Sequence, residues 1–289
     1  MTQRMTASRT DGFLLVDKPA GVTSHDVVAQ IRRSRDGVRT GHTGTLDPFA
    51  TGLLIVALGT ATRLIRFVPA EPKVYEAVIQ FGAATDTDDA TGAVVQSAPA
   101  PVDAVVRDAI AQLTGTIDQQ PPDYSAKQVG GQRAYRLARK GREPGLSPAT
   151  VTVHGWDVRS FVDGVLHATI TCGSGTYIRA LARDLGRLSG SVAHLAALRR
   201  THIGPFDVTN AVSPAVAHDT TPLAPAEALV GMLRCVVDDD GVSHLRHGRS
   251  IPATAVGDRA ALLDATGELV AIAEREGEWW RPRIVLGNG

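Results

Sequence analysis

The sequence predicts an α+β protein with a small β-rich region at its C-terminal end. Stretches of period-two alternation, typical of strands, are interspersed with stretches whose apolar residues recur at helical spacing. Residues 208–226 mix Pro, Ala and Thr with little periodicity, which indicates a linker, and short strand-like pieces separated by turn residues follow it. With 289 residues, the chain has room for about two domains.

The composition excludes several classes of protein. Hydrophobic residues make up 43% of the chain and charged residues 21%, so a sizeable core can form and wholesale disorder is excluded. The longest aliphatic run, residues 53–58, is too short to cross a bilayer, and the first ten residues lack the apolar segment of a signal peptide. The two cysteines, Cys172 and Cys235, cannot form a disulfide framework. We therefore expect a cytoplasmic protein with no membrane association.

The first half of the chain is expected to alternate short strands with helices. Hydrophobic patterning predicts strands at 13–16, 53–58 and 74–81. It predicts helices at 60–68 and 102–113, and a helix capped by Ser24 whose apolar positions are Val27, Val28 and Ile31. Between the first helix and the second strand, residues 41–52 read as a loop rich in Gly and Thr.

The second half contains an insertion and then returns to regular elements. Residues 118–150 combine Pro and Gly pairs with a basic stretch, which favours an insertion over the core. Strands are expected at 150–161 and 165–172, followed by a helix at 176–188. Short strands are expected after the linker, at 235–237, 260–263, 269–273 and 284–286.

The basic residues are clustered although the net charge is zero. Segments 32–39, 131–142 and 179–200 hold 14 of the 30 basic residues and two acids. A single cluster of this kind is most often a solvated helix face. Three clusters dominated by arginine favour a surface that binds a polyanion if the fold brings them together, because the guanidinium donates two parallel hydrogen bonds to phosphate.

The most distinctive loop carries Asp47 between Leu46 and Pro48. The glycines of segment 41–52 allow a ligand to approach the backbone closely, and Pro48 stiffens the chain just after the carboxylate. Taken alone, an Asp beside a Pro is an ordinary turn signal. The spacing of a phosphate-binding P-loop is absent.

Several long motifs occur in one order along the chain. They are VDKPAGVTSHDVV (16–28), GHTGTLDPFATGLLIVALGTATR (41–63), YEAVIQFGAATDTDDATG (75–92), GTYIRALARDLG (175–186) and AHLAALRRTHIGPF (193–206). In this order they closely resemble the bacterial tRNA pseudouridine synthase B family. Segment 121–141 is similar to that family's insertion, with Gln128 and Gly130 where a basic residue and an Asn or Asp are typical.

The resemblance implies a fold and a reaction. The expected fold is the pseudouridine-synthase fold, a mixed and mostly antiparallel sheet flanked by helices. The expected reaction isomerises uridine to pseudouridine at position 55 in the T-arm loop of tRNA, after the base has been flipped out of its stack. The resemblance implies no cofactor and no metal. It implies tRNA as the partner, no obligatory protein partner and a monomeric enzyme.

The resemblance also implies roles for individual residues. Asp47 matches the nucleophile, which attacks either ribose C1′ or uracil C6. Arg179 matches the arginine that pairs with this aspartate, and a cation there favours the ionised carboxylate. Tyr75 matches a tyrosine that lies against the uracil face and serves in proton transfer. The expected substrate-binding residues are His42, Tyr177, Leu198 and Lys18, and the expected RNA-backbone contacts are Arg133, Arg136, Arg139, Lys140, Arg199 and Arg200.

The resemblance divides the chain into two domains. Residues 1–225 match the catalytic domain, and residues 228–289 are similar to a small β-barrel RNA-binding domain of the PUA type. The supporting residues in the second domain are few and include Gly248, Gly267 and the ending Arg281-Pro282-Arg283. Cys235, His244 and His247 are too few for a closed zinc site, which needs four ligands.

Two other functions use the same residues. An RNA chaperone would need the arginines but not Asp47. A nucleoside hydrolase with a catalytic carboxylate would release free uracil, whereas an isomerase retains the base.

Overall fold

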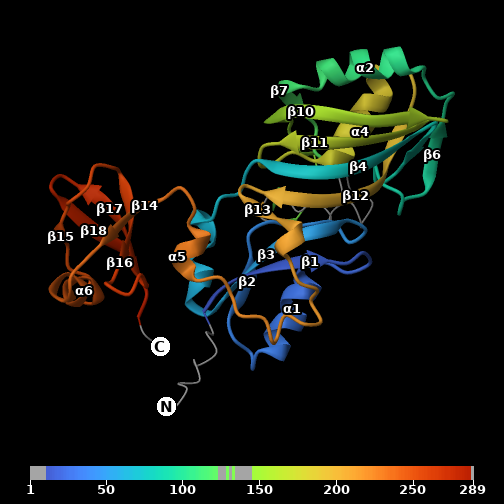
Figure 1. The fold of residues 1–289 in the computed structure, drawn as a ribbon. Coiled ribbons are helices and arrows are strands. Elements are labelled where there is room, and N and C mark those ends of the chain that lie inside the picture. The colour runs from blue at the N-terminus through green and yellow to red at the C-terminus, as the bar shows by residue number, and fades with distance from the viewer. Residues whose placement is uncertain (1–10, 123–127, 130–131, 134–144, 288–289) are drawn as a thin grey trace.

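A nine-stranded sheet forms the centre of the molecule (Figure 1). The structure, a computed structural model, describes residues 11–122, 128–129, 132–133 and 145–287. The strands of this sheet are β1 (Gly12–Lys18), β2 (Thr40–His42), β3 (Thr51–Leu58), β4 (Lys73–Phe81), β7 (Gly115–Gln119), β10 (Ala149–Val162), β11 (Val165–Cys172), β12 (Ala193–Ile203) and β13 (Phe206–Asp207). Their order is β1-β3-β12-β4-β11-β10-β7, with β2 on β3 and β13 on β12. Every pair is antiparallel except β3 with β12, so the expected mixed, mostly antiparallel sheet is confirmed.

Helices cover the two ends of this sheet separately. The helical elements around the sheet are α1 (Ser24–Ser34), α2 (Asp103–Gln112), α4 (Ile178–Leu188), α5 (Pro225–Ala228) and the 3-10 helices η1 (Gly59–Phe67) and η2 (Val208–Asn210). Helix α1 packs Val27 and Ile31 against β1 and β3, while α2 and α4 lie at the β10 and β11 end (Figure 1). Helix 60–68 of the prediction is the 3-10 helix η1. In the described part of the chain, no helix has the length and apolar character to cross a membrane.

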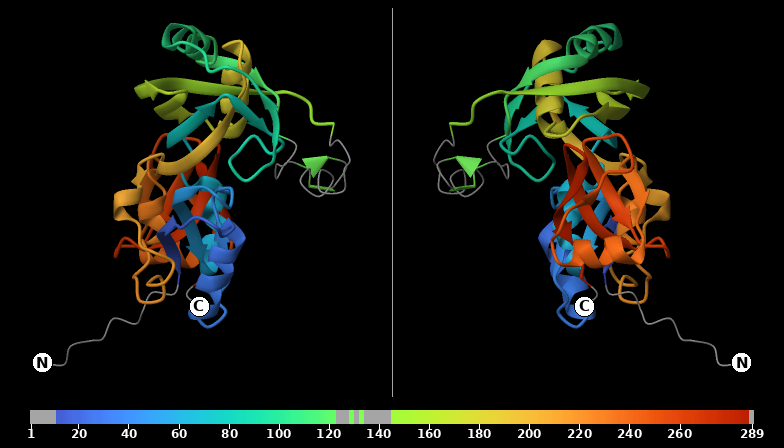
Figure 2. Two further views of the ribbon diagram at one scale, coloured as in Figure 1. Left: turned by 90° about the vertical axis from the view of Figure 1, so that its right-hand side faces the viewer. Right: turned by 90° about the vertical axis from the view of Figure 1, so that its left-hand side faces the viewer.

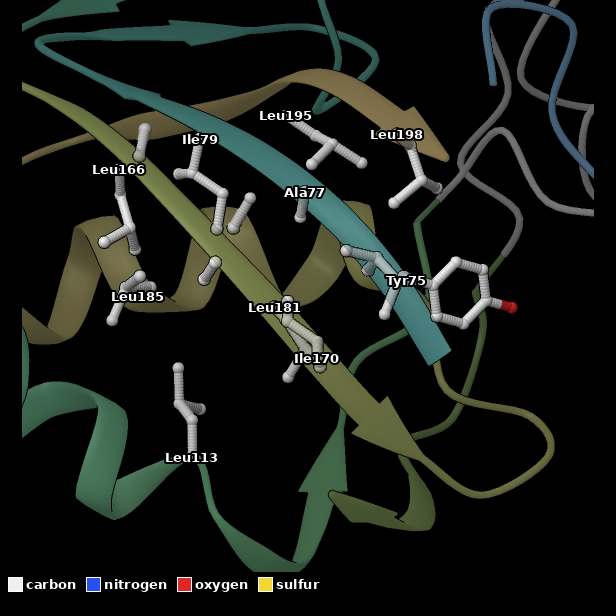
Figure 3. Close-up of a cluster of buried hydrophobic side chains, with 14 of the residues drawn as sticks. Tyr75, Ala77, Ile79, Leu113, Leu166, Ile170, Leu181, Leu185, Leu195 and Leu198 are labelled. Carbon is white, nitrogen blue, oxygen red and sulfur yellow. The ribbon is translucent and has the colours of Figure 1, made fainter. Parts of the chain in front are cut away.

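The main apolar core lies between the sheet and α4. Alternation along β4 puts Tyr75, Ala77 and Ile79 on one face, where they pack with Leu181 and Leu185 of α4 (Figure 3). Tyr75 lies at the end of this cluster, and its hydroxyl points away from the apolar side chains (Figure 3). The packing of β4 therefore brings one aromatic ring to the edge of the core.

A separate five-stranded sheet follows α5, as the C-terminal patterning predicts. Its elements are β14 (Leu233–Val236), α6 (Asp239–Arg246), β15 (Ile251–Pro252), β16 (Arg259–Leu263), β17 (Leu269–Glu276) and β18 (Trp279–Val285). The strand order is β14-β16-β17-β18-β15. Leu64 of η1 shares an apolar cluster with Ile272 and Ile284, so this sheet is docked beside η1 (Figure 1).

Two short hairpins complete the fold. They are β5 (Ala83–Thr85) with β6 (Val94–Ser97), and β8 (Gln128–Val129) with β9 (Gln132–Arg133). The second pair belongs to the expected insertion 118–150 and projects from the main sheet, as the short green strands in both views of Figure 2 show.

Two local predictions are wrong. The N-cap of α1 is Thr23, whose side chain accepts a hydrogen bond from the Asp26 N–H, while Ser24 is the first helical residue. Segment 208–226 is not a free linker, because Val212 and Leu223 pair with the backbone of β1. That pairing gives hydrogen-bond partners to backbone groups on the outer edge of β1, and it fixes the path of the chain toward the second sheet.

Candidate active site

The loop between β2 and β3 places Asp47 against the first turn of α4. Nε of Arg179 donates to Oδ2 of Asp47 at 2.8 Å, and Nη2 donates to Oδ1 at 3.1 Å. Arg179 is buried, whereas the Asp47 side chain is 33% exposed. The pair is bidentate, so one guanidinium binds both carboxylate oxygens and fixes the orientation of the carboxylate. The side of the carboxylate that faces away from Arg179 stays accessible to a ligand.

Arg179 is itself held by the segment that precedes β6. Its Nη1 donates to the carbonyl oxygen of Thr87 at 3.0 Å, and its Nε lies 3.6 Å from Oδ2 of the buried Asp89. Asp89 also accepts hydrogen bonds from Thr87 Oγ1 and from the N–H of Thr91. Arg179 is therefore fixed between two carboxylates, and its head group has little freedom to move. Asp89 lies within the motif 75–92, but nothing in the sequence predicts a role for it.

The side chains of Lys18 and Ser24 hold the Asp47 loop through hydrogen bonds to its backbone. The ammonium group of Lys18 donates to the carbonyl oxygens of Pro19 and Val22, both at 2.8 Å, and of Pro48 at 3.2 Å. Ser24 Oγ accepts from the Leu46 N–H and donates to the Leu46 carbonyl. The Lys18 side chain is fully buried, so the expected direct substrate contact is wrong and Lys18 is instead a support for the residue after Asp47.

Replacement of Lys18 with Met is expected to destabilise the fold. Three carbonyl oxygens would lose their donor, so the free energy of unfolding should fall by roughly 2 kcal/mol or more at pH 7. Burial lowers the pKa of Lys18 from 10.5 to about 8. Between these values the unfolded chain keeps a proton that the folded chain has lost, so this group's contribution to stability rises with pH.

Denaturant titrations at several pH values test this account of Lys18. The difference in unfolding free energy between wild type and Lys18→Met should grow from pH 8 to pH 10. Arg33→Met, on the exposed side of α1, is the control and should change stability by less than about 0.5 kcal/mol. A difference that stays flat with pH would contradict the account.

Arg200 supports the same loop from the sheet. Its guanidinium donates to the carbonyl oxygens of Leu53, Thr45 and Gly44, and the residue is 1% exposed. The prediction that Arg200 contacts the RNA backbone is therefore wrong, because its donors are used within the protein. The backbone of Arg200 also lies 2.2 Å from where a Cβ on Gly52 would be, so only glycine fits at the start of β3.

A cavity of about 270 Å³ opens beside Asp47. Its lining comes from the Asp47 loop, from the starts of β4 and α4, and from β12; it includes Tyr75, Tyr177, Leu198 and Arg179. Burial raises the pKa of Tyr75, so its phenol keeps its proton at neutral pH. Five of the residues predicted from the sequence therefore line one cavity with Asp47: Tyr75, Tyr177, Leu198, Arg179 and Arg200. Such a cavity suits a single planar ring better than a large ligand, since pockets for drug-sized molecules measure roughly 300–1,000 Å³.

Tyr177 and His42 are positioned by different parts of the backbone. Tyr177 is the N-cap residue of α4, and the buried Gln119 side chain holds its main chain by accepting from the N–H at 2.8 Å and donating to the carbonyl at 3.1 Å. His42 ends β2, opposite Val56 of β3, just before the loop that lines the cavity. Among the described residues, no three His, Cys, Asp or Glu side chains gather as a metal site.

The arginine clusters do not form one free basic surface in the described part of the chain. Arg199 makes a bidentate pair with Asp17, and Arg183 pairs with Asp88 and Asp184. Arg35 donates to two backbone carbonyls. The predicted contacts at Arg136, Arg139 and Lys140 lie outside the described residues, as does the side chain of Arg133.

Solved structures share this fold. The chain superimposes with a TM-score of 0.72 on a protein in the "Structure of H/ACA RNP bound to a substrate RNA containing 2'-deoxyuridine", at 22% identity, covering 96% of this chain and 85% of that one. A second match, to the "archaeal box H/ACA sRNP Nop10-Cbf5 complex", has a TM-score of 0.70, 24% identity and coverage of 96% and 86%. These likenesses establish the fold alone.

The class of protein follows from matches to sequence families. The N-terminal domain of the TruB family pseudouridylate synthases matches residues 32–178, and the C-terminal domain of tRNA pseudouridylate synthase B matches residues 179–230. Both matches place the chain among the pseudouridylate synthases. A curated protein from Thermobifida fusca (strain YX), named tRNA pseudouridine synthase B, is 43% identical over 96% of this chain and 99% of its own length. One of the same name from Mycobacterium bovis (strain BCG / Pasteur 1173P2) is 40% identical over 95% of each chain. The chain belongs to the TruB pseudouridylate synthase family.

Proposed function

We propose that this protein isomerises uridine to pseudouridine at position 55 in the T-arm loop of tRNA. The observation that carries the proposal is the bidentate pair of Asp47 and Arg179 at the edge of a cavity that also contains Tyr75. Relatives with about the same length as this chain carry the name tRNA pseudouridine synthase B, which supports tRNA as the substrate.

Asp47 acts as the nucleophile in this reaction. The N1–C1′ bond of uridine breaks, the uracil turns, and a C5–C1′ bond forms while C5 loses a proton and N1 gains one. The product has the same atoms as the substrate. A carboxylate that attacks ribose C1′ or uracil C6 divides this change into easier steps. In either route Asp47 must be correctly directed, and its bidentate pair with Arg179 fixes the direction of both carboxylate oxygens.

The target base reaches Asp47 by leaving its stack in the RNA. Flipping costs a few kcal/mol, and contacts with the extruded base offset part of that cost. The Tyr75 ring and Leu198 offer a flat apolar surface for uracil within the cavity. A larger groove of about 510 Å³ shares Leu198 with the cavity and is lined by Phe49 and Arg199. Its position supports a polynucleotide substrate rather than a free nucleoside.

The two parts of the chain have separate tasks in this proposal. Residues 1–225 form the catalytic domain, with the insertion 118–150 over the RNA and His42 filling the space that the flipped base leaves. Residues 228–289 form a PUA-like domain that contacts RNA. The enzyme acts in the cytoplasm as a monomer and needs no cofactor, and these statements stay predictions.

Tyr75→Leu should lower turnover much more than RNA affinity. Turnover at saturating RNA is expected to fall about 100-fold or more, while Kd changes less than about threefold, because the ring acts at the reacting base. Single-turnover rates and filter binding measure the two quantities. Tyr75→Phe is the matched variant that keeps the ring and separates its contribution from that of the hydroxyl. Equal losses of affinity and turnover in Tyr75→Leu would reduce Tyr75 to a binding contact.

Incubation with unmodified tRNA tests the proposed function directly. The altered nucleotide is then mapped by chemical modification that blocks reverse transcription at pseudouridine. The expected result is one modified position, uridine 55, in full-length tRNA and in an isolated T-arm stem-loop. Modification at another position would overturn the assignment of the site in tRNA, and no modified position would overturn the activity.

A further inference from the structure

Lys73 lines the same cavity as Asp47 and Tyr75 without a role in the chemistry described above. It is the first residue of β4, and residues two apart on a strand point to the same face, so Lys73 and Tyr75 lie side by side. Its side chain also approaches the Asp47 loop, since a Cβ on Gly44 would lie 4.0 Å from Lys73 Cε. Lys73 is therefore at the edge of the space that the reacting nucleotide would occupy.

The charge of Lys73 differs from that of the other two cations around the cavity. Arg179 is paired with Asp47 and Asp89, and Arg200 donates to backbone carbonyls. Lys73 Nζ donates to Ser174 Oγ at 3.2 Å, and the neighbouring Glu71 carboxylate accepts from the Ser174 N–H at 2.9 Å. None of the ion pairs found among the described residues includes Lys73. Burial and the charge of Arg200 lower the pKa of Lys73. A bound anion would offset both effects and favour the ammonium form.

The start of α4 lines the cavity next to Lys73, which contacts Ser174 just before it. Residues Gly175 to Arg179 line the cavity, and this turn begins an 11-residue helix. The N-cap residue Tyr177 makes no side-chain capping hydrogen bond to the first turn. The positive end of the helix dipole at this turn favours an anion at this position.

We propose that Lys73, together with the first turn of α4, binds the backbone phosphate that flanks the target uridine. The inference rests on the proposed function, because it takes the substrate to be RNA. It assigns Lys73 to positioning and to selection of a polynucleotide over a free nucleoside. The phosphate would hold the flipped nucleotide at its backbone while Tyr75 and Leu198 contact its base.

Salt dependence of RNA binding tests the phosphate contact. Lys73→Ala should raise Kd for an unmodified T-arm stem-loop about tenfold at low salt and lower the slope of log Kd against log [KCl] by about 0.7 to 0.9. Lys73→Arg should retain most of both. Arg107→Ala on α2 removes the same charge from an exposed ion pair away from the cavity, and should leave Kd and slope unchanged. Equal slopes for Lys73→Ala and wild type would overturn the proposal.

A modified RNA locates the phosphate. Methylphosphonate at the linkage 5′ or 3′ of the target uridine removes one charge, and wild type should lose about tenfold in affinity at one of the two positions. Lys73→Ala should show little further loss there. A full additional loss in Lys73→Ala at both positions would overturn the contact. Wild-type pseudouridine formation is measured in the same preparations, so failure of the proposed function is recognised separately.

Discussion

Asp47→Asn is expected to abolish pseudouridine formation and to leave the affinity for tRNA within about threefold of wild type. An amide has nearly the size of a carboxylate and its oxygen can still accept a hydrogen bond from Arg179. It has no negative charge and cannot form the covalent bond that the reaction requires, so we expect turnover to fall by at least about four orders of magnitude. Single-turnover assays and filter binding on the same RNA measure the two effects.

Asp17→Asn is the matched control for this variant. Asp17 also makes a bidentate pair with an arginine, Arg199, and its side chain is 35% exposed against 33% for Asp47. It lies outside the cavity lining. We expect Asp17→Asn to keep near-normal turnover. Product formation by Asp47→Asn at the wild-type rate would mean that another group is the nucleophile, whereas loss of tRNA binding would favour a structural role for Asp47.

Arg179→Lys is the change with the second largest expected effect. Lysine keeps the positive charge, but its single ammonium group lacks the planar fork of donors of arginine. It therefore cannot make both hydrogen bonds to Asp47 together with the one to the Thr87 carbonyl. A displacement of about 1 Å at a reacting group costs about 100-fold. We therefore expect turnover to fall by a factor of about 100 to 1,000 with little change in Kd.

Arg183→Lys is the control for Arg179→Lys, one helical turn further along α4. Arg183 donates to Asp88 and to the Gln120 carbonyl and makes no contact with Asp47. Its replacement should lower turnover less than about threefold, and thermal unfolding should report similar stability for both variants. Equal activity losses for the two substitutions would mean that the effect comes from α4 packing and not from direction of Asp47.

Much of the fold and of the site could be predicted because local patterns and long motifs agree. The alternation along β4 correctly predicts which face of the strand is buried. The resemblance of the segment around Arg179 to the family correctly predicts that Arg179 pairs with Asp47. Lys18 and Arg200 lie near Asp47, as the resemblance implies, but both side chains point into the protein and donate to backbone carbonyls. Their motifs carry no information on whether a cation points outward to phosphate or inward to three carbonyls.

The sequence pattern does not predict the central strand β12, and the reason is physical. Its pairing with β4 shifts between Leu195 and Ala197 and again between Arg200 and His202, so the apolar residues lose their period of two. The parallel contact between β3 and β12 involves only two residue pairs. No short-range pattern predicts either feature. The ion pairs of Arg183 with Asp88 and of Arg199 with Asp17 are likewise between residues far apart in sequence.

Analysis of the nucleosides from treated tRNA tests the central claim most directly. A transcript labelled in its uracil rings is incubated with the enzyme, digested and separated by chromatography. We predict one labelled pseudouridine for each tRNA, with the label retained in the nucleoside fraction and no free uracil. Release of labelled uracil, or tRNA binding with every uridine unchanged, would contradict isomerisation at Asp47 and would leave a hydrolase or an RNA-binding protein in its place.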